Sequence, residues 1–377
     1  MTTLWRGVPV ALLLALSAEV AAKPTPGRLS FVSERQGHRD VYVISADGQN
    51  ETRLTDGPEE DSNGPSTPDG GRILITTGSG AAPDARSVRF WLRSLAAAAP
   101  VGTRSPLATP GSSDLLASPR AVLLAPGFTA DGTRLIFESE PDPGQPGLRE
   151  IYSLSLGQAR TGRPSLRQLT RNPEGNFAPT ICGPSGYIAF TSSRDRGSEL
   201  YRMRSDGSDV RRLTYSGGSK WQPRCSPEGL RIFFVSDREG ADRIYSVHRN
   251  GSEPRRLTGH SLDPAQIEDS PAIAPDGRML AYVLRGAGLG ARLHVLDLVT
   301  GRDCEVPTPA GSRASDPDWS PRGTDGGSRV AFALQPADRD GQPASAERQI
   351  AVTDRGCTRI FAVTSARGPN WHPLWIR

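Results

Sequence analysis

The stretch QPRCSPEGLRIFFVSDREGADRIYSVHRNGSEPRRLT, residues 222–258, decides the fold of this chain. Residues 178–214 repeat its order of features: a proline-glycine turn, two short apolar runs, a second glycine turn and the triplet Arg-Leu-Thr. The two stretches are offset by about 44 residues, a spacing typical of four-stranded propeller blades. Self-similarity at a fixed period therefore predicts a repeat fold.

Each part of the repeat has a local physical reason. Residues 226–229 read Ser-Pro-Glu-Gly, a tight turn in which proline presets φ and glycine takes the last position. Residues 232–235, Ile-Phe-Phe-Val, form a short run with the composition of a strand. Asn250 and Gly251 favour a hairpin, because the tightest hairpin turns need positive φ. Each unit is therefore expected to form four antiparallel strands.

Similar units recur along almost the whole chain. Their proline anchors are Pro65, Pro126, Pro179, Pro223, Pro271 and Pro317. Residues 28–55 supply the last three strands of a further unit, and residues 368–373 supply a first strand with nothing after it. Joining the two ends would complete a blade and remove an open sheet edge. We predict an all-β, closed β-propeller of seven blades, with six as the alternative because residues 65–109 are irregular.

The first 22 residues have the features of a secretory signal peptide. Arg6 precedes the apolar run of residues 8–16, and Val20, Ala21 and Ala22 offer small residues for cleavage. No later apolar run approaches the roughly 20 residues that a membrane helix needs. The sequence therefore predicts a periplasmic or secreted protein, with residues 23–377 forming a single propeller domain and no membrane span after cleavage.

The charge pattern argues against nucleic-acid binding. The net charge is +4, and the arginines alternate with acids instead of gathering in a basic stripe. Lys23 and Lys220 are the two lysines of the chain. We expect no nucleic-acid partner and a monomeric protein.

Four cysteines are present, and their spacing matches no zinc site. Cys182 and Cys225 fall at matching positions of neighbouring repeats, and Cys304 and Cys357 do so approximately. In an oxidising compartment the pairs Cys182–Cys225 and Cys304–Cys357 could form disulfides, and free buried thiols are the alternative.

The repeat resembles the WD-like repeats of the TolB β-propeller family, whose pattern runs Pro-x-Trp-Ser-Pro-Asp-Gly, Ile-x-Phe, Ser-x-Arg-Asp, Leu-Tyr, Asp-Gly and Arg-Leu-Thr. The matching residues are 188–214, 232–258 and 316–323. TolB carries an α/β domain ahead of its propeller, whereas here we expect the repeats to start within a few residues of the cleavage site. The resemblance implies a periplasmic protein that binds an envelope protein or lipoprotein partner.

Signals for catalysis are weak. The sequence has no G-x-S-x-G nucleophile elbow. His294 lies in an apolar strand, where a structural role is the simpler interpretation. His260 lies near Asp263, Glu268 and Asp269, which could supply acid-base chemistry or form a hydrated loop.

Metal and cofactor signals are equally weak. Asp338, Asp340 and Glu347 could hold Ca²⁺ or lie in a solvated insertion. We expect no catalytic residues, no metal and no cofactor. A propeller enzyme such as a polysaccharide lyase, or a small-ligand or sugar-binding propeller, is the alternative function.

The loops that lead into each first strand are the expected binding surface, because rigid blades commonly present binding loops. Phe177 and Trp221 could be apolar anchors of a contact patch, or could pack between blades as core. The candidate binding residues are Glu60, Asp61, Asn63, Asn176, Phe177, Lys220, Trp221, Gln222, Glu268, Asp269, Asp316 and Asn370. On this basis the sequence predicts a protein-interaction scaffold of the cell envelope.

Overall fold

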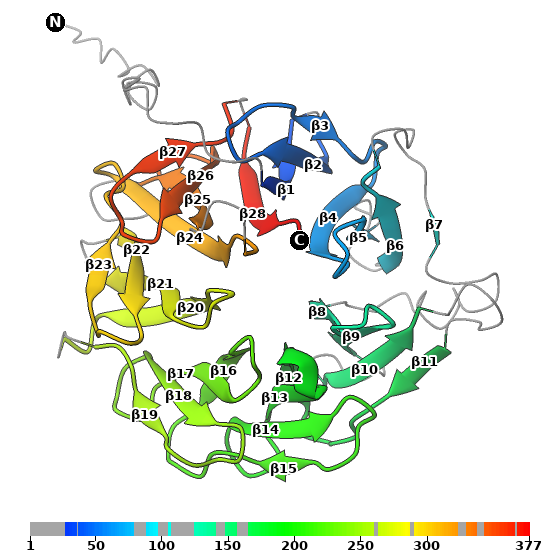
Figure 1. Cartoon of the computed structure of the whole chain (residues 1–377), viewed down its shortest axis with the longest axis vertical. Coiled ribbons are helices and arrows are strands. Elements are labelled where there is room, and N and C mark those ends of the chain that lie inside the picture. Colours follow the sequence, from blue (N-terminus) through cyan, green and yellow to red (C-terminus); the bar gives the residue numbers. More distant parts are fainter. Residues whose placement is uncertain are drawn as a thin grey trace, which may run out of the picture.

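The protein forms a ring of sheets around a central axis (Figure 1). The computed structural model describes residues 27–35, 37–78, 88–96, 105–106, 124–140, 148–156, 165–259, 263–286, 290–322, 329–337, 343–365 and 368–377. The expected signal peptide, residues 1–22, lies outside these ranges. Within them, the one helical element is the short 3-10 turn η2 (Gly183–Ser185), and no helix could cross a membrane.

Seven four-stranded antiparallel sheets, here called blades 1 to 7, make up the ring in the described part of the chain. Blade 1 consists of β28 (Asn370–Trp375), β1 (Arg28–Glu34), β2 (Arg39–Ser45) and β3 (Thr52–Arg53). Blade 2 consists of β4 (Glu60–Ser66), β5 (Arg72–Gly78), β6 (Val88–Ser94) and β7 (Ser105–Pro106). Blade 3 consists of β8 (Leu124–Phe128), β9 (Arg134–Ser139), β10 (Glu150–Ser155) and β11 (Ser165–Gln168). Blade 4 consists of β12 (Asn176–Cys182), β13 (Tyr187–Ser192), β14 (Glu199–Arg204) and β15 (Arg211–Arg212).

The remaining three blades follow the same order. Blade 5 consists of β16 (Lys220–Cys225), β17 (Arg231–Ser236), β18 (Arg243–His248) and β19 (Arg255–Arg256). Blade 6 consists of β20 (Ile267–Ile273), β21 (Met279–Gly286), β22 (Gly290–Asp297) and β23 (Asp303–Glu305). Blade 7 consists of β24 (Ser312–Trp319), β25 (Arg329–Pro336), β26 (Gln349–Asp354) and β27 (Ile360–Ala362). The prediction of seven four-stranded blades is confirmed.

The ring closes through blade 1, which contains both ends of the described chain. β28 pairs antiparallel with β1, with Trp375 opposite Leu29 and Trp371 opposite Val32. The innermost strands β4, β8, β12, β16, β20, β24 and β28 each contact the innermost strands of both neighbouring blades. The predicted closure of tail onto head is therefore confirmed.

The second strand of each blade is apolar on both faces because each blade lies between two others. In β17, Ile232 and Phe234 pack towards blade 4, whereas Val235 packs towards blade 6. A strand covered on both faces reads as a continuous apolar run, not as an alternation. This is the physical reason for the Ile-Phe-Phe-Val run.

The proline anchors lie inside the innermost strands, and each of these strands changes register beside its anchor. In β16 the register shifts between Trp221 and Arg224, and Gln222 has a φ of 49°. Proline is tolerated there because the inner edge of a blade has no ladder partner for its missing N–H. The innermost strands therefore begin before the prolines, in residues that the sequence analysis assigned to loops.

Two faces of the ring can now be defined. Four antiparallel strands return the chain to the side on which it started, so every innermost strand begins on one face, called the front face, and ends on the other, called the back face. The segment before β16, residues 213–219, lies at the front face. The turn after β16, residues 226–229, lies at the back face.

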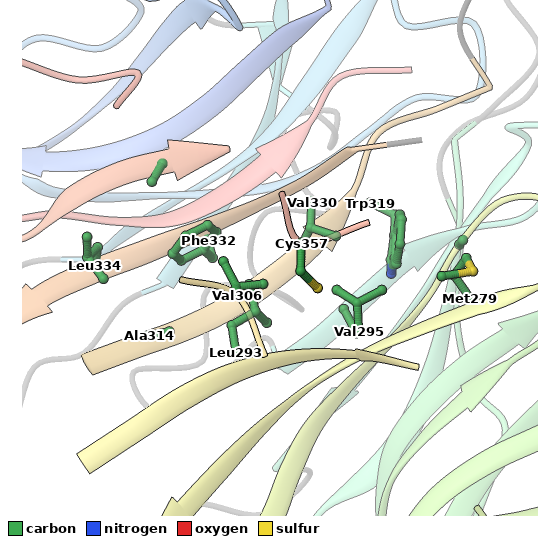
Figure 2. Packing of buried hydrophobic residues seen from close by; sticks show 13 residues of the cluster. Met279, Leu293, Val295, Val306, Ala314, Trp319, Val330, Phe332, Leu334 and Cys357 are labelled. Carbon is green, nitrogen blue, oxygen red and sulfur yellow. The ribbon is translucent and has the colours of Figure 1, made fainter. Parts of the chain in front are cut away.

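The core is divided into seven clusters of buried apolar side chains, one at each junction between blades. Figure 2 shows the junction of blades 6 and 7, where Met279 and Val295 lie opposite Val330, Phe332 and Trp319. The indole N–H of Trp319 also donates a hydrogen bond to the carbonyl oxygen of Ala272, at 2.9 Å. Each blade is thus stabilised by its two neighbours.

Trp375 offers a test of the closure. Its side chain packs in the cluster between blades 7 and 1, and its indole N–H donates to the carbonyl oxygen of Asp318 at 3.2 Å. We expect Trp375→Ala to lower the free energy of unfolding by about 3–5 kcal/mol, because it opens a cavity beside the closing strand. Denaturant unfolding measures this, and the exposed Leu230→Ala is the control. Equal stability of the two variants would contradict a closure that depends on Trp375.

Candidate functional site

Four of the candidate binding residues lie in buried polar links at the junctions between blades. Asn176, Lys220, Glu268 and Asn370 occupy the start of four innermost strands, and their exposed fractions do not exceed 3%. Each link has three members. The first is one of these residues, the second is the residue that begins the third strand of the preceding blade, and the third is the threonine of that blade's Arg-Leu-Thr triplet or its equivalent. These four side chains are therefore not available on the surface of this structure.

The link between blades 4 and 5 shows the full arrangement. Thr214 donates its hydroxyl hydrogen to the carboxylate of Glu199 and accepts the backbone N–H of Leu200 at 2.9 Å. The ammonium of Lys220 lies 3.1 Å from the same carboxylate and also donates to the carbonyl oxygens of Gly217 and Gly218, at 3.1 and 2.9 Å. A buried charge is tolerated only when it is paired and hydrogen-bonded, and Lys220 satisfies both conditions.

Other junctions keep this arrangement with different charges. Between blades 3 and 4, the Asn176 side-chain amide donates to Glu150 at 2.7 Å. Between blades 7 and 1, Asn370 faces Gln349, so both partners are neutral amides.

The junction of blades 5 and 6 reverses the charges. There the third strand of blade 5 carries Arg243, and the innermost strand of blade 6 carries Glu268, 3.9 Å away. Burial raises the pKa of Glu268, while the Thr258 hydroxyl and Arg243 act in the opposite direction. The repeat thus preserves the polar link but not the sign of either partner.

The link at Lys220 generates a prediction. Lys220→Met should lower the free energy of unfolding by about 1.5–3 kcal/mol, because it removes one of the two cations that pair with the buried Glu199 carboxylate and leaves only Arg212, at 3.0 Å. The double variant Glu199→Gln with Lys220→Asn copies the neutral pair of blades 7 and 1, and should recover much of this loss. Chemical denaturation compares the three proteins. A double variant no more stable than Lys220→Met would contradict the proposed equivalence of the junctions.

The remaining polar candidates are engaged in local contacts near the front face. Asp61 is buried and accepts the hydroxyl hydrogen of Thr77. Glu60 pairs with Arg39 at 2.6 Å, and Asp269 pairs with Arg285 at 2.5 Å. These three carboxylates therefore already have partners within the chain.

Three further candidates lie beside the proline anchors. The Asn63 side-chain amide donates to the carbonyl oxygen of His372 at 2.9 Å, which links blade 2 to β28. Gln222 accepts the backbone N–H of Ser270 at 2.8 Å, which links blades 5 and 6. Asp316 accepts the Ser315 hydroxyl hydrogen at 2.8 Å.

The two aromatic candidates are partly exposed and lie at the beginning of neighbouring innermost strands. Trp221 packs against the apolar cluster between blades 5 and 6, so it is core in part. Phe177 is half-buried at the second position of β12.

Tyr215 is an exposed aromatic residue that the sequence analysis missed. It lies in the segment that leads into β16 and is 75% exposed. The guanidinium of Arg212 lies over its ring, 4.6 Å from the centroid. The sequence could have indicated it, because Tyr215 directly follows the Arg-Leu-Thr triplet, which begins at the last residue of the outermost strand β15.

Two charged residues near the axis were also missed. Arg224 and Asp318 each follow a proline anchor, on the innermost strands of blades 5 and 7. Arg224 is exposed to solvent, yet the surrounding protein desolvates its guanidinium and lowers its pKa. Burial raises the pKa of Asp318 to about 6, although the backbone N–H of Trp375, Arg377 and Arg224 favour its charged form.

The interaction between Arg224 and Asp318 places both near the axis of the ring. Their blades are separated by blade 6, so side chains that influence each other from β16 and β24 must approach one another over the centre of the ring.

Asp318 predicts a pH dependence of stability. Its pKa in the folded protein, about 6, exceeds the ordinary value, so the folded state binds more protons between about pH 4 and 6 and the contribution of Asp318 to stability falls as the pH rises through this window. The melting temperature of Asp318→Asn, relative to that of the unmodified protein, should therefore increase from pH 4 to pH 7. Thermal scans across this range measure the difference.

Asp206→Asn is the control with the opposite sign. Hydrogen bonds from Ser208 lower the pKa of Asp206, so this variant should lose stability relative to the unmodified protein as the pH rises through the lowest part of the range, near the ordinary pKa of an aspartate. A difference for Asp318→Asn that stays constant with pH would contradict the assignment.

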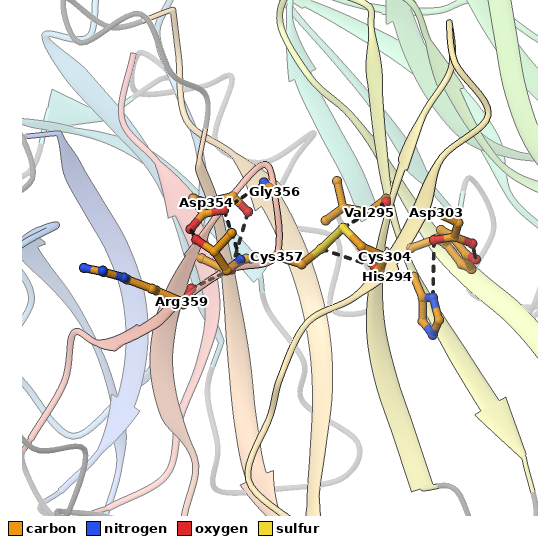
Figure 3. The surroundings of a disulfide bond; sticks show 11 residues. His294, Val295, Asp303, Cys304, Asp354, Gly356, Cys357 and Arg359 are labelled. Carbon is orange, nitrogen blue, oxygen red and sulfur yellow. Dashed lines mark hydrogen bonds and ion pairs between the residues drawn. A yellow bond between two sulfur atoms is a disulfide. The ribbon is translucent and has the colours of Figure 1, made fainter.

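The four cysteines form two bridges between neighbouring blades. Cys182 is joined to Cys225, with Cα atoms 5.0 Å apart, and connects the innermost strands of blades 4 and 5. Cys304 is joined to Cys357, with Cα atoms 6.2 Å apart, and connects blades 6 and 7 away from the axis (Figure 3). Both bridges therefore reinforce junctions in addition to the apolar clusters.

Of the candidate catalytic and metal-binding groups, the structure describes His294, Asp263, Glu268, Asp269 and Glu347. His294 stacks on Tyr282 and lies 3.3 Å from Asp303, within blade 6 (Figure 3). His260 and residues 338–341 lie outside the described residues. Among the described residues no group of three or more His, Cys, Asp or Glu side chains could hold a metal ion.

Comparison with known proteins identifies the family. The model of the TolB beta propeller domain matches residues 103–323. The chain belongs to the TolB beta propeller family. The recognition of this family from the repeat is thereby confirmed.

Solved structures share the propeller fold at low sequence identity. TolB from Acinetobacter baumannii is 20% identical with a TM-score of 0.54, and the match covers 93% of this chain and 66% of that one. A puromycin-hydrolyzing peptidase from Mycobacterium tuberculosis is 17% identical with a TM-score of 0.63, over 91% and 55% of the two chains. An oligogalacturonate lyase in complex with manganese is 12% identical with a TM-score of 0.58, over 91% and 86%. Each of these similarities shows the fold alone, and this chain spans about two thirds of the TolB structure.

Proposed function

We propose that this propeller is an exported protein-interaction module of the cell envelope, which binds an envelope protein or lipoprotein through its front face. The observation that carries the proposal is the aromatic and arginine group at this face, made up of Tyr215, Arg212, Trp221 and Phe177. Aromatic residues and arginine are the types enriched in protein interfaces and in their energetic hot spots.

The support beneath this group suits a binding surface. The segment between Tyr215 and Trp221 wraps around the buried ammonium of Lys220. This ammonium donates hydrogen bonds to the backbone carbonyl oxygens of Ser216, Gly217 and Gly218 and so holds the segment in place. A loop that is already ordered in the free protein loses less conformational entropy when it binds a partner. The partly exposed Trp221 packs against the apolar cluster between blades 5 and 6, which fixes the position of its ring.

Export and the envelope location rest on two arguments. Residues 1–22 have the composition of a signal peptide. Membership of the TolB propeller family supports a periplasmic role for residues 23–377.

Tyr215→Ala is the direct test of the front face. Affinity-tagged protein is crosslinked in envelope extracts, and the captured partner is identified by mass spectrometry and titrated with each variant. We expect at least about tenfold weaker binding, as for a hot-spot aromatic residue, with an unchanged melting temperature because Tyr215 is 75% exposed.

Val299→Ala is the matched control, because Val299 is 67% exposed but lies in the turn after β22, at the back face. Trp221→Ala is less suitable, since its ring also stabilises the fold. Equal partner capture by Tyr215→Ala and Val299→Ala would reject the front face as the binding surface.

A further inference from the structure

We infer that Arg224 forms an anion-binding site on the axis of the propeller, and that this site takes a carboxylate group. The site is separate from the front-face group and does not depend on the proposed function.

One register position near the axis is occupied mostly by small, neutral residues. It is the first paired position after the proline anchor in every innermost strand, and its occupants are Ser66, Gly127, Thr180, Arg224, Ala272, Asp318 and Leu374. Arg224 and Asp318 are the two charged members. Small neighbours leave room beside the guanidinium, which is exposed to solvent.

The guanidinium of Arg224 lacks an anionic partner among the described residues. Its one hydrogen bond there is a donation from Nη1 to the carbonyl oxygen of Pro223, at 3.0 Å. The enclosed cations at the blade junctions differ, since Lys220 pairs with Glu199 and Arg243 with Glu268. An arginine side chain has five N–H donors, and most of those of Arg224 find no acceptor within the part of the chain that the structure describes, so they can serve a ligand.

Asp318 is not a direct anionic partner of Arg224. Its carboxylate accepts the backbone N–H of Trp375 at 2.8 Å, and among the described residues Arg377 and Arg224 act on it only through longer-range electrostatic attraction. It therefore acts on Arg224 only through the longer-range electrostatic attraction between them.

The surrounding charges favour a carboxylate over a more highly charged anion. The planar fork of arginine matches the two oxygen atoms of a carboxylate. The negative charge of Asp318 would repel a second negative charge on the ligand, while Arg377 adds a positive charge near Asp318. The carboxylate could belong to a small acid or to an acidic residue of a peptide segment.

The test uses the complete protein with two probes, acetate and a short peptide with one glutamate, each titrated by calorimetry at constant ionic strength. We expect Arg224→Gln to weaken binding about tenfold or more, because it removes a charge-assisted hydrogen bond. Asp318→Asn should strengthen binding several-fold, because it removes the repelling charge. The two variants therefore change the affinity in opposite directions, which a general loss of stability would not produce.

Arg255→Gln is the matched control, because Arg255 is an exposed arginine on the outermost strand of the same blade. Binding of acetate that depends on Arg224 would identify a small-acid site, and binding of the peptide alone would identify a site for a partner segment. Failure of both probes to bind, or equal losses in Arg224→Gln and Arg255→Gln, would overturn the inference.

Discussion

The antiparallel pairing of β28 with β1 makes one blade from the two ends of the described chain, and the rest of the ring depends on it. Without this pairing, blade 1 would lose its innermost strand and expose an unpaired edge. With it, every blade has two neighbours, and each sheet can be apolar on both faces. The seven separate core clusters follow directly from this closed arrangement.

The junctions combine these clusters with a polar link whose chemistry varies around the ring. Three junctions pair their buried polar groups in different ways: Lys220 with Glu199, Arg243 with Glu268, and Asn370 with Gln349. A polar group buried between two blades must find its partner across the junction, and either sign of charge or a neutral pair will serve. A junction therefore requires a matched polar pair and not one particular residue at either position.

Assigning the motif residues to structure narrows the search for function. In Ser-x-Arg, the arginine lies over the tyrosine of the third strand, as Arg194 lies over Tyr201 at 4.6 Å, and it donates to Asn176 on the innermost strand at 2.9 Å. The repeated residues thus build the blades. Residues that differ between repeats, such as Tyr215 at the front face and Arg224 near the axis, are the better candidates for binding.

The sequence by itself determined the four-stranded repeat, the seven units and the closure of the ring, because turn residues, apolar runs and their spacing are local and recur. Only the tertiary structure decided that Lys220 and Asn370 are buried, since their strands begin before the proline anchors and the burial of each side chain depends on the neighbouring blade. It also decided that Arg224 and Asp318 lie close enough near the axis to attract each other electrostatically. Their proximity depends on the curvature of the whole ring, which no single repeat encodes.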